Sequence, residues 1–290
     1  MPECNVCKST NIIEWKKIDK YKLLKCNQCL IIQTFPQLSE SELEYINNRF
    51  YGRQPFTSVA YNTSAEFFFK RGIKFYEEIK LLKIKGKKLL DIGSGYGYNQ
   101  LVARNNGLIT IGIDLSKNAV EFARNIFNLN VIQESFYAYN FKNSKFSIIT
   151  MYDSLEHVRN PKETIKKVNK LLSDDGYLIL QTPNIDSIMY LLTKSKWVWL
   201  LLPFHFYHFT SASISKILSE SGFRIVKIYT SDDRQEFIKN ILWIIKIRED
   251  GKLRFFYKPL YIFLHLPYFL NWIWNLFNKG GLLHIYAQKI

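Results

Sequence analysis

The pattern of apolar and polar positions after residue 64 predicts a sheet flanked by helices. Short apolar runs with the length of buried strands lie at 88–92, 108–113, 130–133, 146–152 and 176–182. Segments of helical periodicity start near residues 98, 116 and 161, between these runs. Two later runs, 223–229 and 282–287, bring the expected strands to seven. This order predicts an α/β fold whose mainly parallel sheet is covered by helices on both faces.

The segments outside this alternation divide the chain. We expect a cysteine-containing module over 1–45, a helical lead-in over 46–85, the sheet domain over 86–235 plus 280–290, and an insertion over 236–279. The insertion is apolar and basic, and part of it is long enough to cross a bilayer. Because the last strand must rejoin the sheet, we expect instead an interfacial helix pair on anionic lipid, or a lid or dimer contact.

The net charge of the chain indicates which classes of partner it favours. Forty Lys and Arg residues against 25 Asp and Glu residues give a net charge of +15. This excess favours an anionic partner such as a nucleic acid, a nucleotide sugar or an anionic lipid surface, although a solvated basic surface is the alternative. The first residues lack the charged start and apolar stretch of a signal peptide, so we expect a cytoplasmic protein.

All the cysteines are confined to the start of the chain. They form two C-x-x-C pairs, Cys4 with Cys7 and Cys26 with Cys29. Four thiolates in two such pairs predict a tetrahedral structural zinc site, whose metal would stabilise a module with little apolar content of its own. Disulfides or unlinked thiols are the alternatives.

The most specific motif is the glycine-rich turn after the strand at 88–92. Gly93, Ser94, Gly95 and Gly97 follow the strand directly, and the helix after them points its positive end at the turn. The spacing is G-x-G-x-G, whereas a dinucleotide fingerprint is spaced G-x-G-x-x-G. Asp91, two residues earlier, would repel a pyrophosphate but suits a ligand that carries an ammonium group.

A second carboxylate, Asp114, ends the next strand, where it can accept hydrogen bonds from both ribose hydroxyls. At this point the chain resembles the class I S-adenosylmethionine (SAM)-dependent methyltransferases. The resemblance implies that SAM is the cofactor and that further contacts come from Leu115, Ser135, Phe136 and Tyr152. At the position of Ser135 this family usually has an acidic residue that binds the adenine amino group, so here the Ser135 hydroxyl, or the side chain or backbone amide of Phe136, would replace it.

The segment 151–158 after the fourth strand resembles the subgroup that includes quinone-biosynthesis O-methyltransferases. Asp153, Glu156 and His157 stand at i, i+3 and i+4, so one helical turn can aim all three at one point. His157 would then act as general base, or the three would hold a divalent cation, or they would only fix the loop. His205 is a second candidate base, because the family commonly has a histidine before the following helix; packing among aromatic residues is its alternative.

These features together predict a methyltransferase with a small-molecule acceptor. Residues 1 to about 50 resemble the zinc-ribbon leader found before some bacterial methyltransferases, on the stretch 23–36 and the acidic stretch 39–43. We expect O-methylation of a saccharide or a lipid-linked intermediate, as in polysaccharide biosynthesis, with C-methylation of a nucleotide-linked deoxysugar as a close alternative. A nucleic-acid methyltransferase or RNA-binding protein is a less favoured class, since the segment after the fourth strand lacks the Asn/Asp-Pro-Pro-Tyr pattern. A SAM-binding protein without activity is the third alternative.

Overall fold

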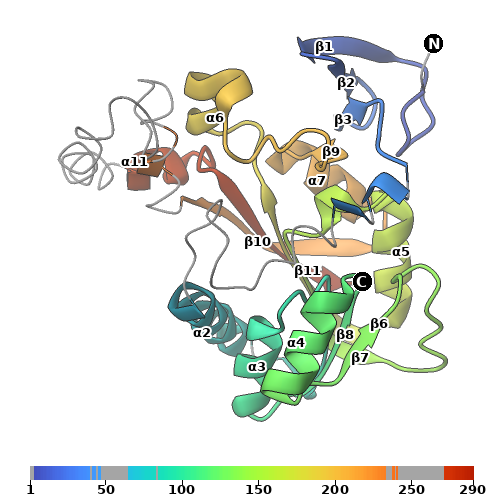
Figure 1. Cartoon of the computed structure of the whole chain (residues 1–290), viewed down its shortest axis with the longest axis vertical. Helices are drawn as coiled ribbons and strands as arrows, with labels where there is room; N and C mark the ends of the chain where they lie inside the picture. The colour runs from blue at the N-terminus through green and yellow to red at the C-terminus, as the bar shows by residue number, and fades with distance from the viewer. Residues whose placement is uncertain are drawn as a thin grey trace.

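The structure is a computed structural model of the chain, drawn in Figure 1. It describes residues 3–39, 41–43, 45–46, 65–82, 84–232, 237–238, 240 and 271–290. Within them the strands form one seven-stranded sheet and one four-stranded sheet. The larger sheet has the order β10-β11-β8-β7-β4-β5-β6.

The seven strands of the larger sheet correspond to the seven apolar runs. They are β4 (Lys88–Ile92), β5 (Ile109–Asp114), β6 (Val131–Gln133), β7 (Phe146–Tyr152), β8 (Leu172–Pro183), β10 (Phe223–Ser231) and β11 (Leu282–Lys289). The pairs between β6, β5, β4, β7 and β8 are parallel, and β11 is antiparallel to both of its neighbours. The predicted fold class, a seven-stranded and mainly parallel α/β sheet, is confirmed.

Helices cover both faces of this sheet. The helices are α2 (Ala65–Leu81), α3 (Tyr98–Asn105), α4 (Lys117–Phe127), α5 (Pro161–Leu171), α6 (Ile188–Thr193), α7 (Ser211–Ser219) and α11 (Asn271–Leu276). Helices α2, α3 and α4 lie together on one side of the sheet in Figure 1, with α5 and α7 on the other. Each parallel strand therefore ends at the edge where loops lead into helices, which is the edge that binds ligands in such sheets.

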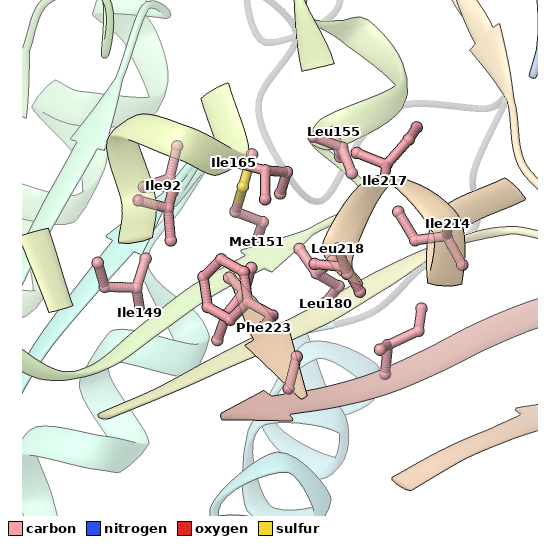
Figure 2. Close-up of a cluster of buried hydrophobic side chains, with 14 of the residues drawn as sticks. Ile92, Ile149, Met151, Leu155, Ile165, Leu180, Ile214, Ile217, Leu218 and Phe223 are labelled. Atoms are coloured by element: carbon pink, nitrogen blue, oxygen red, sulfur yellow. The ribbon is translucent and has the colours of Figure 1, made fainter. Parts of the chain in front are cut away.

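The apolar runs are buried on both faces, and successive residues belong to different cores. Leu89 packs with Phe75 of α2, whereas its neighbour Leu90 belongs to the core that contains Ile165 of α5. Figure 2 shows the second core, in which Ile165 and Leu218 from α5 and α7 meet side chains of the central strands. Burial on both faces explains why these strands are continuous apolar runs rather than alternating ones.

Most of the smaller sheet is formed by the N-terminal cysteine module, which we define as residues 3–39. Its strands are β1 (Ile12–Ile18), β2 (Tyr21–Cys26), β3 (Ile32–Phe35) and β9 (Tyr207–His208), in that order. The last strand comes from far along the chain and pairs antiparallel with β3. A two-residue strand is too short to give a periodic signal, so the sequence did not predict this junction.

Much of the insertion predicted over 236–279 falls outside the described residues. Of it, the structure describes 237–238, 240 and 271–279, including α11. No helix among the residues that are described has the length and apolarity that crossing a bilayer requires. The interpretations of the insertion as an interfacial helix pair, a lid or a dimer contact fall mainly on residues 241–270, which lie outside the described residues.

Candidate active site

The glycine turn after β4 has a backbone that only glycine adopts easily. Gly93, Gly95 and Gly97 have φ angles of +70°, +51° and +79°, in the left-handed region. A Cβ atom on Gly93 would lie 2.7 Å from Cβ of Ser154, so a side chain there would collide with the loop after β7. Gly93 itself is exposed, and a ligand can therefore approach its backbone closely.

Several amide groups of this turn are already used within the protein. The N–H groups of Gly93 and Ser94 donate to the carbonyl oxygen of Ile113 at 2.9 and 3.3 Å. The N–H group of Gly95 donates to Oδ2 of Asp114 at 2.8 Å. A pyrophosphate group needs such donors to be free, whereas a cationic ligand needs acceptors. The turn therefore favours a cationic ligand over a dinucleotide, as the glycine spacing predicts.

Two carboxylates flank the turn. Asp91 is 2% exposed, and its Oδ1 accepts a hydrogen bond from Oγ1 of Thr150 at 2.6 Å. Burial raises the pKa of Asp91 to about 7, and the Thr150 hydroxyl opposes this only in part. Asp114 accepts from the N–H groups of Gly95 and Ser116 at 2.8 Å each, and each of its oxygens keeps a second lone pair. These residues fit a ligand with a cationic end near Asp91 and a diol near Asp114.

The loop after β6 is held by Lys167 of α5. The Nζ atom of Lys167 donates to three carbonyl oxygens within residues 136–139, at distances of 2.6 to 3.0 Å. The ring of Phe136 lies in the core, so its backbone rather than its side chain remains for an adenine contact. Ser135 is half-buried beside it, and Leu115, after β5, is 57% exposed. Both side chains are therefore accessible to a ligand.

Asp153, the first residue after β7, holds α2 against the sheet. Its Oδ2 accepts from Nη2 of Arg71 at 2.5 Å, and its Oδ1 accepts from Nε2 of Gln181 at 2.9 Å. The guanidinium of Arg71 also lies 5.5 Å from the ring centre of Tyr152. Each carboxylate oxygen of Asp153 thus accepts a hydrogen bond from a protein partner, and α2 covers Tyr152.

Glu156, His157 and His205 form a compact cluster beside this loop. One nitrogen or oxygen atom from each residue lies within 4.8 Å of the others. The two imidazole rings meet edge to face with their centres 4.7 Å apart. Glu156 and His205 are 1% and 2% exposed. The sequence grouped Asp153 with Glu156 and His157, but the structure brings His205 to the cluster instead of Asp153, which binds Arg71 and Gln181.

Hydrogen bonds leave one open atom on each member of the cluster. Nδ1 of His157 lies 3.0 Å from the carbonyl oxygen of Phe204, which can only accept, so Nδ1 carries the proton and Nε2 keeps a lone pair. Oε1 of Glu156 and Nδ1 of His205 are buried with no hydrogen-bond partner among the described residues. Three open atoms of this kind suit the removal of a proton from a hydroxyl, or the binding of a divalent cation.

The electrostatics of the cluster follow from its burial. Burial, and then the charge of Asp153, raise the pKa of Glu156 well above its ordinary value. Burial lowers the pKa of His157 and lowers that of His205 further, with the neighbouring histidines adding to the second effect. Both imidazoles are therefore neutral near pH 7, the form in which a histidine accepts a proton or binds a metal.

A comparison with protein families identifies the class of protein to which the chain belongs. The family model described as Methyltransferase domain matches residues 65–228, more than half of the chain. The chain belongs to this family. The sheet order and the glycine turn agree with the match, which shows that the chain contains a class I SAM-dependent methyltransferase domain.

Curated relatives match part of this methyltransferase. The ubiquinone biosynthesis O-methyltransferase of Coxiella burnetii (strain Dugway 5J108-111) is 29% identical over 138 residues, which cover 45% of this chain and 58% of that protein. The protein of the same name from Glaesserella parasuis serovar 5 (strain SH0165) is 35% identical over 117 residues, covering 37% and 50%. The methyltransferase thus spans about half the length of the curated relatives that it matches.

Solved structures share its fold. The plantazolicin methyltransferase BpumL, in complex with SAH, has a TM-score of 0.53 at 20% identity and covers 86% of this methyltransferase and 96% of its own chain. A SAM-dependent methyltransferase from Archaeoglobus fulgidus has a TM-score of 0.53 at 18% identity and covers 77% and 94%. At these identities the similarity shows the fold alone.

The four cysteines of the methyltransferase come together in the N-terminal module. Their Sγ atoms all lie within 4.8 Å of one another, and the Cys4–Cys29 and Cys7–Cys26 pairs are each 3.5 Å apart. These separations exclude disulfides, whose sulfur atoms are about 2.05 Å apart. Four thiolates at about 2.3 Å from one zinc ion are roughly 3.8 Å from each other. The donor set therefore fits a tetrahedral zinc site.

Two residues that contact Asp153 in the candidate site, Arg71 and Gln181, belong to no motif. Arg71 is one of several cations on a helix, and nothing in the sequence separates it from the others. Gln181 could have been identified from the sequence, because a polar residue near the end of a buried strand needs a hydrogen-bond partner. Its backbone is paired with Tyr152 on β7, which places its side chain beside the loop that Asp153 begins.

Proposed function

We propose that this methyltransferase transfers the methyl group of SAM to a hydroxyl group of a small-molecule acceptor. The observation that carries the proposal is the cluster of Glu156, His157 and His205, because the loop that carries Glu156 and His157 packs against the glycine turn. Ser154, between the two sites, donates a hydrogen bond to the carbonyl oxygen of Ile92 at 3.1 Å. A proton acceptor is thereby fixed next to the turn that would bind the methyl donor.

The same geometry supports our proposal for the residues that bind the cofactor. Asp91 would bind the cationic methionine end of SAM, and Asp114 would accept the ribose hydroxyls. Leu115 and Ser135 would contact the adenine together with the backbone of Phe136, while Tyr152 would close the site from the side of β7. When bound, SAM supplies an electrophilic methyl group on a sulfonium, so the protein has to align the acceptor and remove one proton.

His157 is the proposed general base. Its Nε2 has the lone pair, because its Nδ1 proton is held by the Phe204 carbonyl. His205 is the second candidate, since its Nδ1 is open as well. Glu156 lies beside both rings. Burial raises its pKa, and the imidazolium that proton removal produces would lower that pKa again, so that the carboxylate form of Glu156 would stabilise the imidazolium.

The same open atoms fit a divalent cation. Two imidazole nitrogens and one carboxylate oxygen would hold it, with Asp153 outside the set. Such a cation would lower the pKa of an acceptor hydroxyl and thus assist His157 or replace it as the activating group. Addition of Co²⁺ to protein that holds one zinc ion per chain, at the four cysteines, tests this binding, because ligation gives visible absorption bands without turnover. Loss of those bands in Glu156→Gln, with the bands kept in Asp153→Asn, would support the three-residue set.

For the acceptor, our first proposal is a hydroxyl of a saccharide or of a lipid-linked intermediate. The curated relatives act, by name, in ubiquinone biosynthesis, which supports a hydroxylated aromatic acceptor as the second proposal. C-methylation of a nucleotide-linked deoxysugar, and methylation or binding of RNA, remain lesser alternatives. Release of SAH with UDP-glucose, with 1,2-dihydroxybenzene or with RNA as the acceptor distinguishes these classes.

His157→Ala tests the catalytic proposal directly. We expect turnover to fall by about 10³-fold, as for the loss of a general base, while the Kd for SAM measured by calorimetry stays within about twofold. His284→Ala is a control, because His284 is a buried histidine on β11 that lies outside the cluster. Unchanged turnover in His157→Ala would refute the assigned role.

We further propose a structural zinc ion bound by Cys4, Cys7, Cys26 and Cys29. The division of the chain into 1–45, 46–85, 86–235 with 280–290, and 236–279 is the organisation that we propose for the domains. Contact of residues 236–279 with a membrane surface, and a cytoplasmic location, stay predictions.

A further inference from the structure

The cysteine module reaches the histidine cluster through Thr34 on β3. This residue is 1% exposed, and its N–H group donates to the carbonyl oxygen of Phe206 at 2.9 Å. Because β3 pairs with β9, the main chain that follows His205 forms the outer strand of the module's sheet. The module is therefore hydrogen-bonded to the segment that carries a member of the cluster.

The hydroxyl of Thr34 joins two histidines. It lies 2.7 Å from the carbonyl oxygen of His205 and 3.0 Å from Nε2 of His208. A carbonyl can only accept, so the single hydroxyl proton points to His205 and the hydroxyl must accept from His208. His208 is consequently the neutral tautomer with its proton on Nε2. Burial lowers the pKa of His208 to about 3, which keeps this form neutral.

The segment is held from its other side by the cluster itself. The N–H group of Phe206 donates to the carbonyl oxygen of Glu156 at 2.9 Å. The peptide between His205 and Phe206 thus has Thr34 on its carbonyl oxygen and Glu156 on its nitrogen. Since both ends of this peptide are fixed, the direction in which the His205 side chain leaves the backbone is fixed as well.

The neighbour of Thr34 ties the same strand to a cysteine pair. The side-chain amide of Gln33 accepts from the N–H group of Asn5 at 2.9 Å and donates to the carbonyl oxygen of Glu3 at 3.1 Å. Asn5 lies between Cys4 and Cys7. Adjacent residues of β3 therefore bind the segment that carries Cys4 and the segment that carries His205, on opposite faces of one strand.

We propose that Thr34 is a positioning residue of the active site, whose hydroxyl fixes the His205 backbone and the His208 tautomer and thereby aims the His205 imidazole into the cluster. The inference rests on the proposed function, because it takes the cluster as the catalytic group. It gives the cysteine module a part in the reaction, beyond that of a separate stabilising domain.

The test compares three substitutions of similar size. Thr34→Val removes the hydroxyl at almost constant volume, and Thr34→Ser keeps it. Thr193→Val is the matched control, because Thr193 is 5% exposed and its Oγ1 donates to the carbonyl oxygen of Met189 at the same 2.7 Å. A general effect of losing a buried hydroxyl would be shared by Thr34→Val and Thr193→Val.

The first readout is ¹⁵N NMR of the five histidines of the chain, which reports tautomers without an acceptor. In the wild type His208 should be protonated on Nε2. Thr34→Val should shift the resonances of His208 and His205, while Thr34→Ser and Thr193→Val leave them in place. An Nδ1–H tautomer in the wild type would overturn the inference even if Thr34→Val did not fold, and so would unchanged resonances in a folded Thr34→Val.

The second readout is turnover with the acceptor that wild-type enzyme methylates in the panel above. Thr34→Val should lower kcat by about tenfold and leave KM for SAM within about twofold, and Thr34→Ser should restore most of the rate. If His205→Ala is inactive but Thr34→Val is as active as Thr193→Val, the positioning role is wrong and the proposed function stands. If the wild type methylates nothing and binds no SAM, the proposed function fails, while the NMR result still decides the role of Thr34.

Discussion

Arg71 on α2 and Asp153 after β7 form an ion pair with 2.5 Å between Nη2 and Oδ2, and each side chain is 24% exposed. This pair joins α2 to the loop after β7, which carries Glu156 and His157 of the candidate site. Arg71→Met should lower kcat/KM by about tenfold, since a charge-assisted hydrogen bond of this kind contributes roughly 1.5–3 kcal/mol.

The control for Arg71→Met is Lys162→Met. Lys162 pairs with Glu220 at 2.6 Å and is also 24% exposed, but it links α5 to the end of α7. Steady-state kinetics of both variants separate a local effect from a general one. Equal activities of the two variants would show that the Arg71 pair only contributes to folding.

Asp91 predicts a pH dependence of SAM binding. Its pKa in the free protein is raised to about 7 by burial, and a bound cation would lower it again. Binding should therefore release a proton below about pH 7, and the affinity for SAM should fall as the pH decreases from there. Calorimetry in buffers of different ionisation enthalpy measures this release. Asp91→Asn should bind SAM weakly with no proton release.

The raised pKa of Asp91 also predicts how the free energy of unfolding depends on pH. A carboxyl group whose pKa is raised from 3.8 to about 7 binds more protons in the folded state, so its unfavourable contribution grows as the pH rises between these values. Free of ligand, Asp91→Asn should be more stable than the wild type at pH 8, by up to roughly 4 kcal/mol. The difference should shrink at pH 5. Chemical denaturation at both pH values measures it, and equal stabilities at pH 8 would contradict the prediction.

The glycine turn offers a test with an internal control. Gly93 and Gly107 both have positive φ angles, +70° and +89°, but a Cβ atom would meet Ser154 at 2.7 Å in the first case and nothing within 4 Å in the second. Each alanine substitution should cost about 1 kcal/mol of backbone strain. Gly93→Ala should lose further stability and its SAM binding, whereas Gly107→Ala should keep SAM binding. Thermal unfolding and calorimetry check both.

The cysteine cluster predicts a metal-dependent stability. Protein purified without chelator should contain about one zinc ion per chain in elemental analysis. Removal of the metal with a strong chelator should lower Tm, because the free energy of metal binding contributes to folding of the module. Cys26→Ser should contain less zinc and resemble the chelated protein. Equal Tm values before and after chelation would exclude a stabilising metal.

The sequence predicted those parts of the molecule that depend on neighbouring residues. The turn at Gly93 and the start of α3 at Tyr98 follow from local backbone requirements. Thr210 is the N-cap of α7, since its side chain accepts from the N–H group of Ser213 at 3.1 Å. Signals of this kind need only a few consecutive residues, so they can be identified from the sequence alone.

The arrangement of the histidine cluster could not be predicted in the same way. Spacing along one helical turn grouped Asp153 with His157, yet the backbone at Asp153 has φ +48° and turns its side chain toward Arg71. His205 joins the cluster from a separate loop, through contacts of its segment with Thr34 and Glu156. Such contacts between distant segments leave no periodic pattern in the sequence.

The pairing of β3 with β9 has a consequence for the order of events during synthesis. Thr34 on β3 and His205 just before β9 are 171 positions apart, so β3 leaves the ribosome long before β9 has been synthesised. Contacts of such long range form late in folding. In a nascent chain whose four cysteines have already come together, the edge of β3 that pairs with β9 is still exposed. His205 and His208 gain their final surroundings only when residues 206–208 have emerged.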